Sequence, residues 1–208
     1  TPTTTDGCSD NGSVTNDHPL PIFPVGTTVV TWTVKDAAGN TATCQQNVTV
    51  VDTQDPFINC PGNRTVNADA GKCYATNVSL GTPTTFDNCG VASVTNNAPV
   101  QFPVGTTVVT WTVTDVHGRT STCSQNVTVR DNQDPTIVCP ADITVNADAG
   151  NCQSTIDNLG TPTTNDNCGV QSVTNNHPSS IYPVGTTNVT WTVTDLHGRK
   201  IGRASCRE

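Results

Sequence analysis

The stretch FPVGTTVVTWTV at residues 23–34 decides the fold, because it recurs along the chain at a fixed interval. It returns unchanged at residues 102–113 and as YPVGTTNVTWTV at residues 182–193. The tryptophans of the three copies, Trp32, Trp111 and Trp191, are therefore 79 and 80 residues apart. Self-similarity at a fixed period is the signature of a repeat protein, so the sequence predicts tandem modules of about 80 residues.

Apolar residues alternate with threonine inside each copy. Val109, Trp111 and Val113 share one parity, and threonines occupy the positions between them. A period of two is that of a strand with one buried face. The segment 120–129 follows a short turn, shows the same alternation and is the expected hairpin partner. A module of this size built from such strands is typical of an immunoglobulin-like or fibronectin-like sandwich. The predicted fold class is all-β, with tandem β-sandwich modules.

Two acidic segments, VDTQDP at residues 51–56 and RDNQDP at residues 130–135, mark the module boundaries. We expect residues 1–52 to be the C-terminal part of module 1 and residues 53–131 to be a complete module 2. Residues 132–200 are expected to be a module 3 that lacks its last strand. The chain is interpreted as a fragment of a longer tandem array.

The last eight residues, IGRASCRE at 201–208, leave the repeat. Modules 1 and 2 continue as TCQQNVTV and TCSQNVTV at this point, whereas the tail carries its Cys206 three places off register. It also contains the only glutamate of the chain, Glu208. The tail matches a translation of a common sequencing adapter, so we interpret residues 201–208 as not native and exclude them from functional reasoning.

Composition and charge exclude several classes of function. The formal net charge is −8 and lysine occurs three times, which argues against a nucleic-acid partner because phosphate binding needs basic clusters. No run of 18 apolar residues occurs, so we expect no membrane insertion in this segment. No nucleophile, base and acid converge, so the chain is predicted not to be an enzyme. The histidines are interpreted as exposed turn residues: His18, His117, His177 and His197.

Four cysteines per complete module favour disulfides over zinc, because their spacings are long and irregular and no C-x2-C pair occurs. Four cysteines allow three pairings. The last strand of such a sandwich runs parallel to part of the first, which places Cys60 beside Cys123 and leaves the other two cysteines to each other. The predicted bridges are therefore Cys60–Cys123, Cys73–Cys89 and Cys152–Cys168.

Several segments together resemble the hyalin repeat, or HYR, domain. They are DPTIVCPADITVNADAG at 134–150, DNCG at 166–169, the PVGTT stretch and the TC-QNVTV strand. Modules 2 and 3 match along nearly their whole length and module 1 over its second half. The resemblance implies an extracellular immunoglobulin-like module, used in tandem arrays for adhesion and surface architecture, without a catalytic site. The regular repeat and its Asn/Thr-rich, Lys-poor composition resemble those of the HYR arrays of large bacterial surface or secreted proteins.

The predicted function is a non-catalytic structural or adhesion array at the cell surface or in a secreted multidomain protein, where it spaces or presents other domains. The alternative is an accessory carbohydrate- or matrix-binding region of a large secreted enzyme. The expected partners are other modules of the same chain and a surface or matrix protein or carbohydrate.

The module boundaries carry candidate calcium ligands, similar to the linkers of cadherins but with fewer acidic residues. The candidates are Asp52, Asp55, Asp131 and Asp134. Carboxylate oxygens are the ligands that calcium prefers. The simpler interpretation is that these aspartates cap turns before proline. No other cofactor is expected. The DNCG elements are interpreted as tight turns held by a disulfide.

Two sequons are candidate glycosylation sites. Asn126 and Asn188 each begin an Asn-x-Thr triplet and lie on the parity opposite the core residues. Their side chains are therefore expected to face solvent, where a glycan can be attached.

Overall fold

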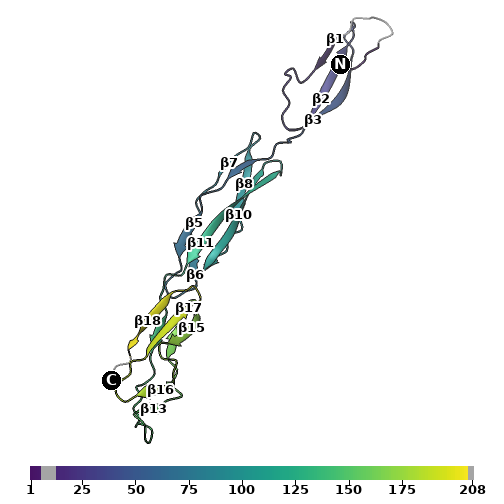
Figure 1. Cartoon of the computed structure of the whole chain (residues 1–208). Coiled ribbons are helices and arrows are strands. Elements are labelled where there is room, and N and C mark those ends of the chain that lie inside the picture. Colours follow the sequence, from purple (N-terminus) through teal and green to yellow (C-terminus); the bar gives the residue numbers. More distant parts are fainter. Residues whose placement is uncertain (6–12, 206–208) are drawn as a thin grey trace. The chain divides into compact units, whose positions relative to one another are not determined.

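The computed structural model describes residues 1–5 and 13–205, and every regular element in these ranges is a β-strand (Figure 1). Residues 206–208, which include Cys206, lie outside the described residues. The chain divides into two compact units. One unit comprises Thr1–Phe57, Phe86–Ser93 and Thr114–Ser121, and the other comprises Ile58–Thr85, Val94–Val113 and Thr122–Glu208. No described segment is a helix of the length and apolarity needed to cross a bilayer.

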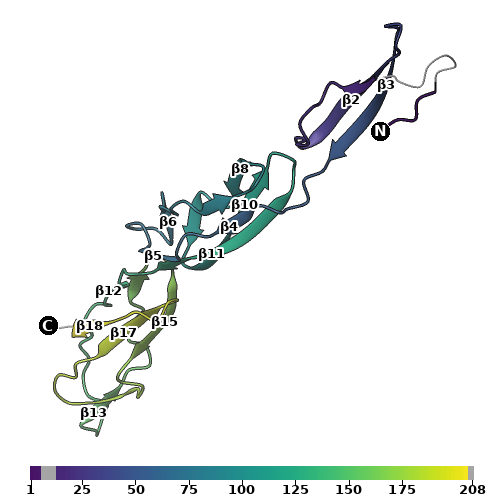
Figure 2. The ribbon, with the colours of Figure 1, turned by 90° about the horizontal axis from the view of Figure 1, so that it is seen from above.

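Module 1 is a three-stranded antiparallel sheet in the order β1-β2-β3. Its strands are β1 (Ser13–Asn16), β2 (Gly26–Lys35) and β3 (Thr41–Val50). Strands β2 and β3 pair along their whole length, from Gly26 opposite Val50 to Lys35 opposite Thr41, as the long hairpin of Figure 2 shows. Only Val30 of its apolar face is buried, because no second layer of strands covers it in the described residues.

Module 2 is a β-sandwich. Its strands are β4 (Phe57–Asn59), β5 (Arg64–Asn67), β6 (Tyr74–Thr76), β7 (Thr84–Phe86), β8 (Val91–Asn96), β9 (Gln101–Pro103), β10 (Gly105–Asp115) and β11 (Thr120–Arg130). The main sheet has the order β5-β11-β10-β8, and the ribbons β4-β7 and β6-β9 complete the module. Strands β11 and β5 are parallel, with Val129 opposite Val66. This pairing confirms the predicted parallel approach of the last strand to part of the first.

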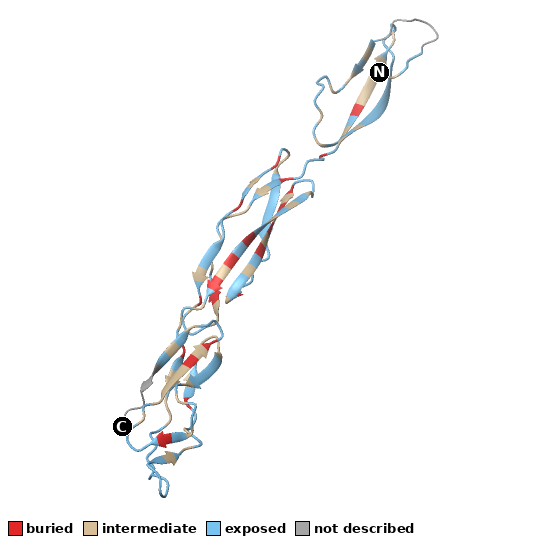
Figure 3. Cartoon of the chain, viewed as in Figure 1, coloured by how far each residue is buried: buried red, intermediate tan, exposed pale blue. Residues whose placement is uncertain are grey.

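The core of module 2 follows the predicted alternation. Val109, Trp111 and Val113 are 0%, 7% and 0% exposed. Figure 3 shows buried positions along β10 and β11. The buried cluster consists of Ala68, Ala75, Phe102, Val109, Trp111, Val127 and Val129. Threonines take the outward positions because a β-branched side chain suits a strand whose other face is wet.

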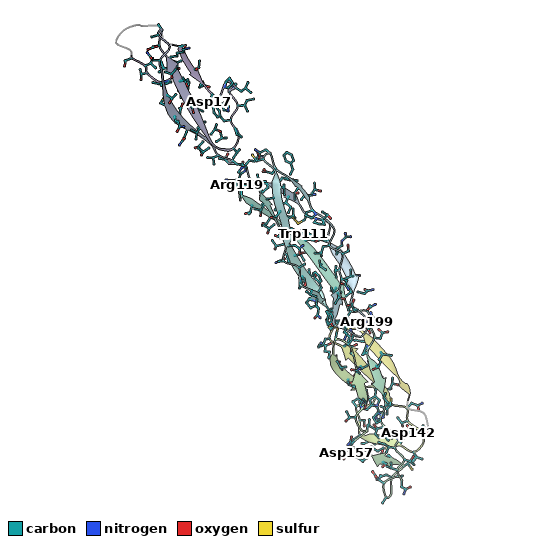
Figure 4. The ribbon with its side chains drawn as sticks, turned by 180° about the vertical axis from the view of Figure 1, so that it is seen from behind. Asp17, Trp111, Arg119, Asp142, Asp157 and Arg199 are labelled. Atoms are coloured by element: carbon teal, nitrogen blue, oxygen red, sulfur yellow. A yellow bond between two sulfur atoms is a disulfide. The ribbon has the colours of Figure 1, made fainter. Side chains whose placement is uncertain are left out.

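A buried glutamine cross-links this core. Gln125 on β11 is 0% exposed, and its Oε1 accepts a hydrogen bond from Trp111 Nε1 at 3.1 Å. Its Nε2 donates to the carbonyl oxygens of Gly62 at 2.8 Å and Leu80 at 2.9 Å. The side chain therefore joins the central tryptophan, labelled in Figure 4, to two loops of the module.

Module 3 repeats this layout, with strands β17 and β18 shorter than their counterparts β10 and β11. Its strands are β12 (Thr136–Val138), β13 (Gln153–Thr155), β14 (Thr163–Asn165), β15 (Val170–Asn175), β16 (Ile181–Pro183), β17 (Thr190–Asp195) and β18 (Lys200–Ser205). They form the sheet β15-β17-β18 and the ribbons β12-β14 and β13-β16. The prediction that this module lacks its last strand needs correction, because β18 pairs antiparallel with β17. The pairing uses backbone groups, which accept almost any side chain, so the interpretation of residues 201–208 as not native stays a prediction.

Within the described residues, strand β18 covers only part of the expected strand. It ends at Ser205, which corresponds to Gln125, whereas β11 continues to Arg130 and pairs with β5. Residues 143–146, which correspond to β5, form no strand. A cavity of about 430 Å³ lies there, lined by Ile143, Val145, Leu159 and Trp191 among others. The core of module 3 is therefore more open than that of module 2.

Candidate functional site at the module junctions

Two disulfides are formed by the described cysteines, and one of them differs from prediction. Cys60 pairs with Cys123 across a Cα–Cα distance of 5.8 Å, as predicted. Cys73 pairs with Cys168 across 4.8 Å. The predicted Cys73–Cys89 and Cys152–Cys168 bridges are therefore wrong, and Cys89 and Cys152 are free thiols. The second bridge joins module 2 to module 3.

The length of strand β10 explains the correction. The carbonyl of Cys73 accepts a hydrogen bond from Val104 N, just before β10 begins. The carbonyl of Gly90, next to Cys89, accepts one from Val116 N, just after β10 ends. A strand of eleven residues is roughly 35 Å long, whereas a disulfide needs Cα atoms within about 7 Å. Cys73 therefore pairs with the DNCG turn of the following module.

Polar contacts accompany this bridge between modules 2 and 3. Asn167 Nδ2 donates to the carbonyl of Lys72 at 2.8 Å. The boundary residue Gln133 accepts a hydrogen bond from Gly71 N at 3.0 Å and donates to Asp69 O at 3.4 Å. The loop around Cys73 is thus held by both the boundary segment and the DNCG turn of module 3.

The DNCG elements are tight turns organised by their aspartates. Asp166 Oδ1 accepts a hydrogen bond from Cys168 N at 2.8 Å, and Asp87 Oδ1 accepts one from Cys89 N at the same distance. The glycine that ends each turn has a positive φ, 115° at Gly90 and 103° at Gly169, which side chains with a Cβ rarely adopt. The turn leaves the second carboxylate oxygen of its aspartate buried and without a hydrogen-bond partner.

Three aspartates meet at the first junction, between modules 1 and 2, and the boundary segment, the DNCG turn and the end of strand β10 contribute one each. At the first junction, oxygens of Asp52, Asp87 and Asp115 lie within 4.8 Å of one another, and these residues are 8%, 8% and 1% exposed. The residues at the corresponding positions of the second junction are Asp131, Asp166 and Asp195. Oxygens of Asp131 and Asp166 group with Cys168, and oxygens of Asp131 and Asp195 group with His197.

Histidines that the sequence assigned to exposed turns contact these clusters. His117 Nδ1 lies 3.1 Å from Asp52 Oδ2, and His197 Nδ1 lies 3.2 Å from Asp131 Oδ2. Their rings remain about one-third exposed, at 33% and 34%, while the aspartate side chains are 1% and 0% exposed. His117 and His197 occupy the same turn position in modules 2 and 3, and this recurrence is the feature of the sequence that could have indicated the contact.

The predicted ligands Asp55 and Asp134 do not join the clusters. Asp55 Oδ1 accepts a hydrogen bond from Arg119 Nε at 2.8 Å, and Asp134 Oδ1 accepts one from Arg199 Nε at 2.9 Å. The two arginines are labelled in Figure 4. Both aspartates are more than half exposed, and pairs of this kind contribute about 0–1 kcal/mol. Each boundary therefore brings only one of its two candidate aspartates, Asp52 or Asp131, close to aspartates of the adjoining module, and calcium binding stays a prediction.

Comparison with known proteins agrees with the repeat. The family model of the HYR domain matches residues 1–50, 51–129 and 130–207 in succession. The chain belongs to the HYR domain family. It is similar to hyalin of Strongylocentrotus purpuratus, with 35% identity over 95% of the chain, and to hyalin of Lytechinus variegatus, with 36% identity over 95%. It spans 17% and 39% of the length of these two relatives.

The HYR modules also have structural neighbours of low sequence identity. Extracellular cadherin domains 1–4 of protocadherin gamma B7 align over 86% of this chain and 56% of that chain, with 16% identity and a TM-score of 0.40. This likeness is one of fold alone.

The first HYR junction shifts the acidity of two groups. Hydrogen bonding from the backbone N–H of Gln54 lowers the pKa of Asp52; burial opposes this, and the Cys89 thiol and His117 lower it further. Burial raises the pKa of the Cys89 thiol, and the charge of Asp52 raises it further. Burial and the neighbouring carboxylate therefore disfavour the thiolate form of Cys89.

Alkylation should distinguish the two free cysteines Cys89 and Cys152 by their reaction rates. We expect Cys152, which is exposed, to react with iodoacetamide at pH 7.5 at least about tenfold faster than Cys89, because the thiolate is the reactive form and Cys89 is half-buried with a raised pKa. Mass spectrometry of peptides over time gives both rates, and the exposed Cys44 serves as an internal reference. Equal rates at Cys89 and Cys44 would show that the Cys89 thiol is neither shielded by burial nor raised in pKa.

The candidate glycosylation residues of the HYR modules are accessible. Asn126 on β11 and Asn188 before β17 are both exposed. Attachment of a glycan to either residue stays a prediction.

Proposed function

We propose that this HYR array is a non-catalytic extracellular spacer, which holds neighbouring domains apart or presents them at a surface or within a secreted protein. The observation that carries the proposal is the Cys73–Cys168 disulfide, which joins successive modules instead of closing one of them. A joint fixed by a covalent bond keeps two modules in register under load, whereas a flexible linker does not.

Three further observations support an extracellular, structural role. Disulfides persist in oxidising compartments, and Cys60–Cys123 is a second bridge within the module core. The relatives that match along 95% of the chain are hyalins. The same contacts between an aspartate and a histidine recur at both junctions, which is expected when a joint is repeated along an array. Binding of a carbohydrate or matrix protein by a secreted enzyme's accessory region stays a prediction.

Proteolysis of the boundary tests the rigidity of the joint. We expect trypsin to cleave after Arg130 roughly tenfold faster or more in the Cys73→Ser/Cys168→Ser double variant than in the oxidised wild type, because the local opening free energy sets the rate of cleavage of a folded segment. The fragments are quantified by mass spectrometry under non-reducing conditions.

The matched control is Cys89→Ser/Cys152→Ser, which removes the equivalent cysteines that form no bridge in the structure. This variant should be cleaved at the wild-type rate. If wild type and Cys73→Ser/Cys168→Ser are cleaved equally fast, the boundary is mobile even with its disulfide and the spacer function fails.

A further inference from the structure

We infer that each junction binds one hard divalent cation, calcium, through a triad of aspartates that differs from the pair expected from the boundary segment. The first site consists of Asp52, Asp87 and Asp115, and the second consists of Asp131, Asp166 and Asp195. The inference goes beyond the spacer function, which rests on the Cys73–Cys168 disulfide between modules 2 and 3 and does not require a cation.

Buried carboxylate oxygens without partners carry the inference. Asp87 Oδ2 and Asp115 Oδ2 are buried at the first junction and take part in no hydrogen bond. Asp166 Oδ2 and Asp195 Oδ2 repeat this at the second. Buried polar atoms in folded proteins almost always have partners, so four equivalent orphan oxygens indicate a missing ligand.

The other oxygen of each orphaned carboxylate is fixed by its own turn. Asp115 Oδ1 accepts hydrogen bonds from His117 N at 2.7 Å and Arg119 N at 2.9 Å, and Asp87 Oδ1 accepts from Cys89 N and Gly90 N. These donors hold the carboxylates in place before a ligand arrives, and each carboxylate keeps one buried oxygen without a partner.

The charge of the triad requires a counterion. At the first junction three carboxylates with oxygens within 4.8 Å repel one another, and burial removes the water that would screen them. The nearby guanidinium group of Arg119 does not neutralise the triad, because it is paired with the exposed Asp55. His117 contacts the boundary aspartate Asp52, so the orphan oxygens of the other two aspartates have no cationic side chain as partner.

Comparison of the two junctions decides the class of metal. At the first junction Asp52, Cys89 and His117 also lie close together, a set that would suit zinc. At the second junction the corresponding cysteine, Cys168, is bonded to Cys73 and has no thiolate to offer. The orphan carboxylate oxygens are common to both junctions. Oxygen ligands of this kind select calcium over zinc.

Titration calorimetry of the full chain with calcium chloride tests the inference. We expect two calcium ions per chain in the wild type, one in Asp87→Asn and none in Asp87→Asn/Asp166→Asn. Asparagine keeps the Oδ1 acceptor that forms the turn but removes the charge. The control is Asp55→Asn/Asp134→Asn. It alters one aspartate in each of the same two boundary segments, but these aspartates pair with arginines. This variant should still bind two ions.

Thermal melting separates loss of binding from loss of folding. Calcium at a hundredfold excess over its dissociation constant should raise the melting temperature of the wild type by roughly 10 °C relative to chelator. In chelator, Asp87→Asn/Asp166→Asn should melt at or above the wild-type temperature, because the repulsion has been relieved. In calcium it should melt below the wild type.

Two results would overturn the inference. The first is a wild type whose melting temperature and calorimetric titration do not respond to calcium. The second is tighter binding of zinc than of calcium that disappears in Cys89→Ser, which would assign the first junction to the mixed thiol set. Neither result would affect the trypsin assay of the disulfide joint, so failure of the cation site and failure of the spacer function are distinguishable.

Discussion

Replacing Gln125 by leucine is expected to lower the free energy of unfolding of module 2 by about 3 kcal/mol or more, because each buried group left without a partner costs about 1–3 kcal/mol. Three groups lose their partner at once: Trp111 Nε1 and the carbonyls of Gly62 and Leu80. Leucine is close to glutamine in size, so the change removes hydrogen bonds rather than volume. The melting temperature should fall by roughly 12–24 °C, given about 4–8 °C per kcal/mol for a module of this size.

Module 1 provides the matched control. Trp32 Nε1 donates to Gln46 Oε1 at 3.0 Å, so the same pair exists there, but this glutamine is exposed. Gln46→Leu should change stability by no more than about 0.5 kcal/mol, because water replaces the lost partner. Hydrogen exchange followed by mass spectrometry reports the two modules separately. Similar losses of protection in both variants would show that Gln125 does not act through its buried hydrogen bonds.

Removal of the Cys60–Cys123 bridge is expected to cost module 2 about 4 kcal/mol. The two cysteines are 63 residues apart, and closing a loop of that length in the unfolded chain accounts for a loss of about this size. Both side chains also pack against the buried cluster, so Cys60→Ala/Cys123→Ala loses some contacts as well. Urea unfolding of the double variant should show a large decrease in the midpoint.

The control for this variant is Cys152→Ala, since Cys152 is exposed and forms no bridge in the structure. It should unfold at the wild-type midpoint. A second comparison is Cys73→Ala/Cys168→Ala, whose bridge joins two modules and lies outside the core of module 2. If that variant loses as much hydrogen-exchange protection in β10 and β11 as Cys60→Ala/Cys123→Ala, the assignment of Cys60–Cys123 as the bridge of the core is wrong.

Local pattern in the sequence determined the module and its core. The alternation around Trp111 predicted one buried face, and the structure confirms it, because side chains on a strand point to opposite faces whatever the surrounding fold. The same rule placed Gln125 on the buried parity next to Val127, although the sequence did not indicate what a buried glutamine bonds to. The parallel approach of β11 to β5, and with it Cys60–Cys123, followed from the topology of a sandwich.

The disulfide pairing and the aspartate contacts at the junctions depend on the tertiary structure. A period of 79 residues makes Cys89 and Cys168 equivalent in the sequence, so the pattern cannot distinguish a bridge within one module from a bridge to the next. The choice depends on which end of β10 each cysteine occupies, and only the folded strands fix that. The aspartate triad of the first junction has the same origin. Asp52, Asp87 and Asp115 are far apart in the chain, and they meet because a boundary segment, a turn and a strand end converge at one end of a module.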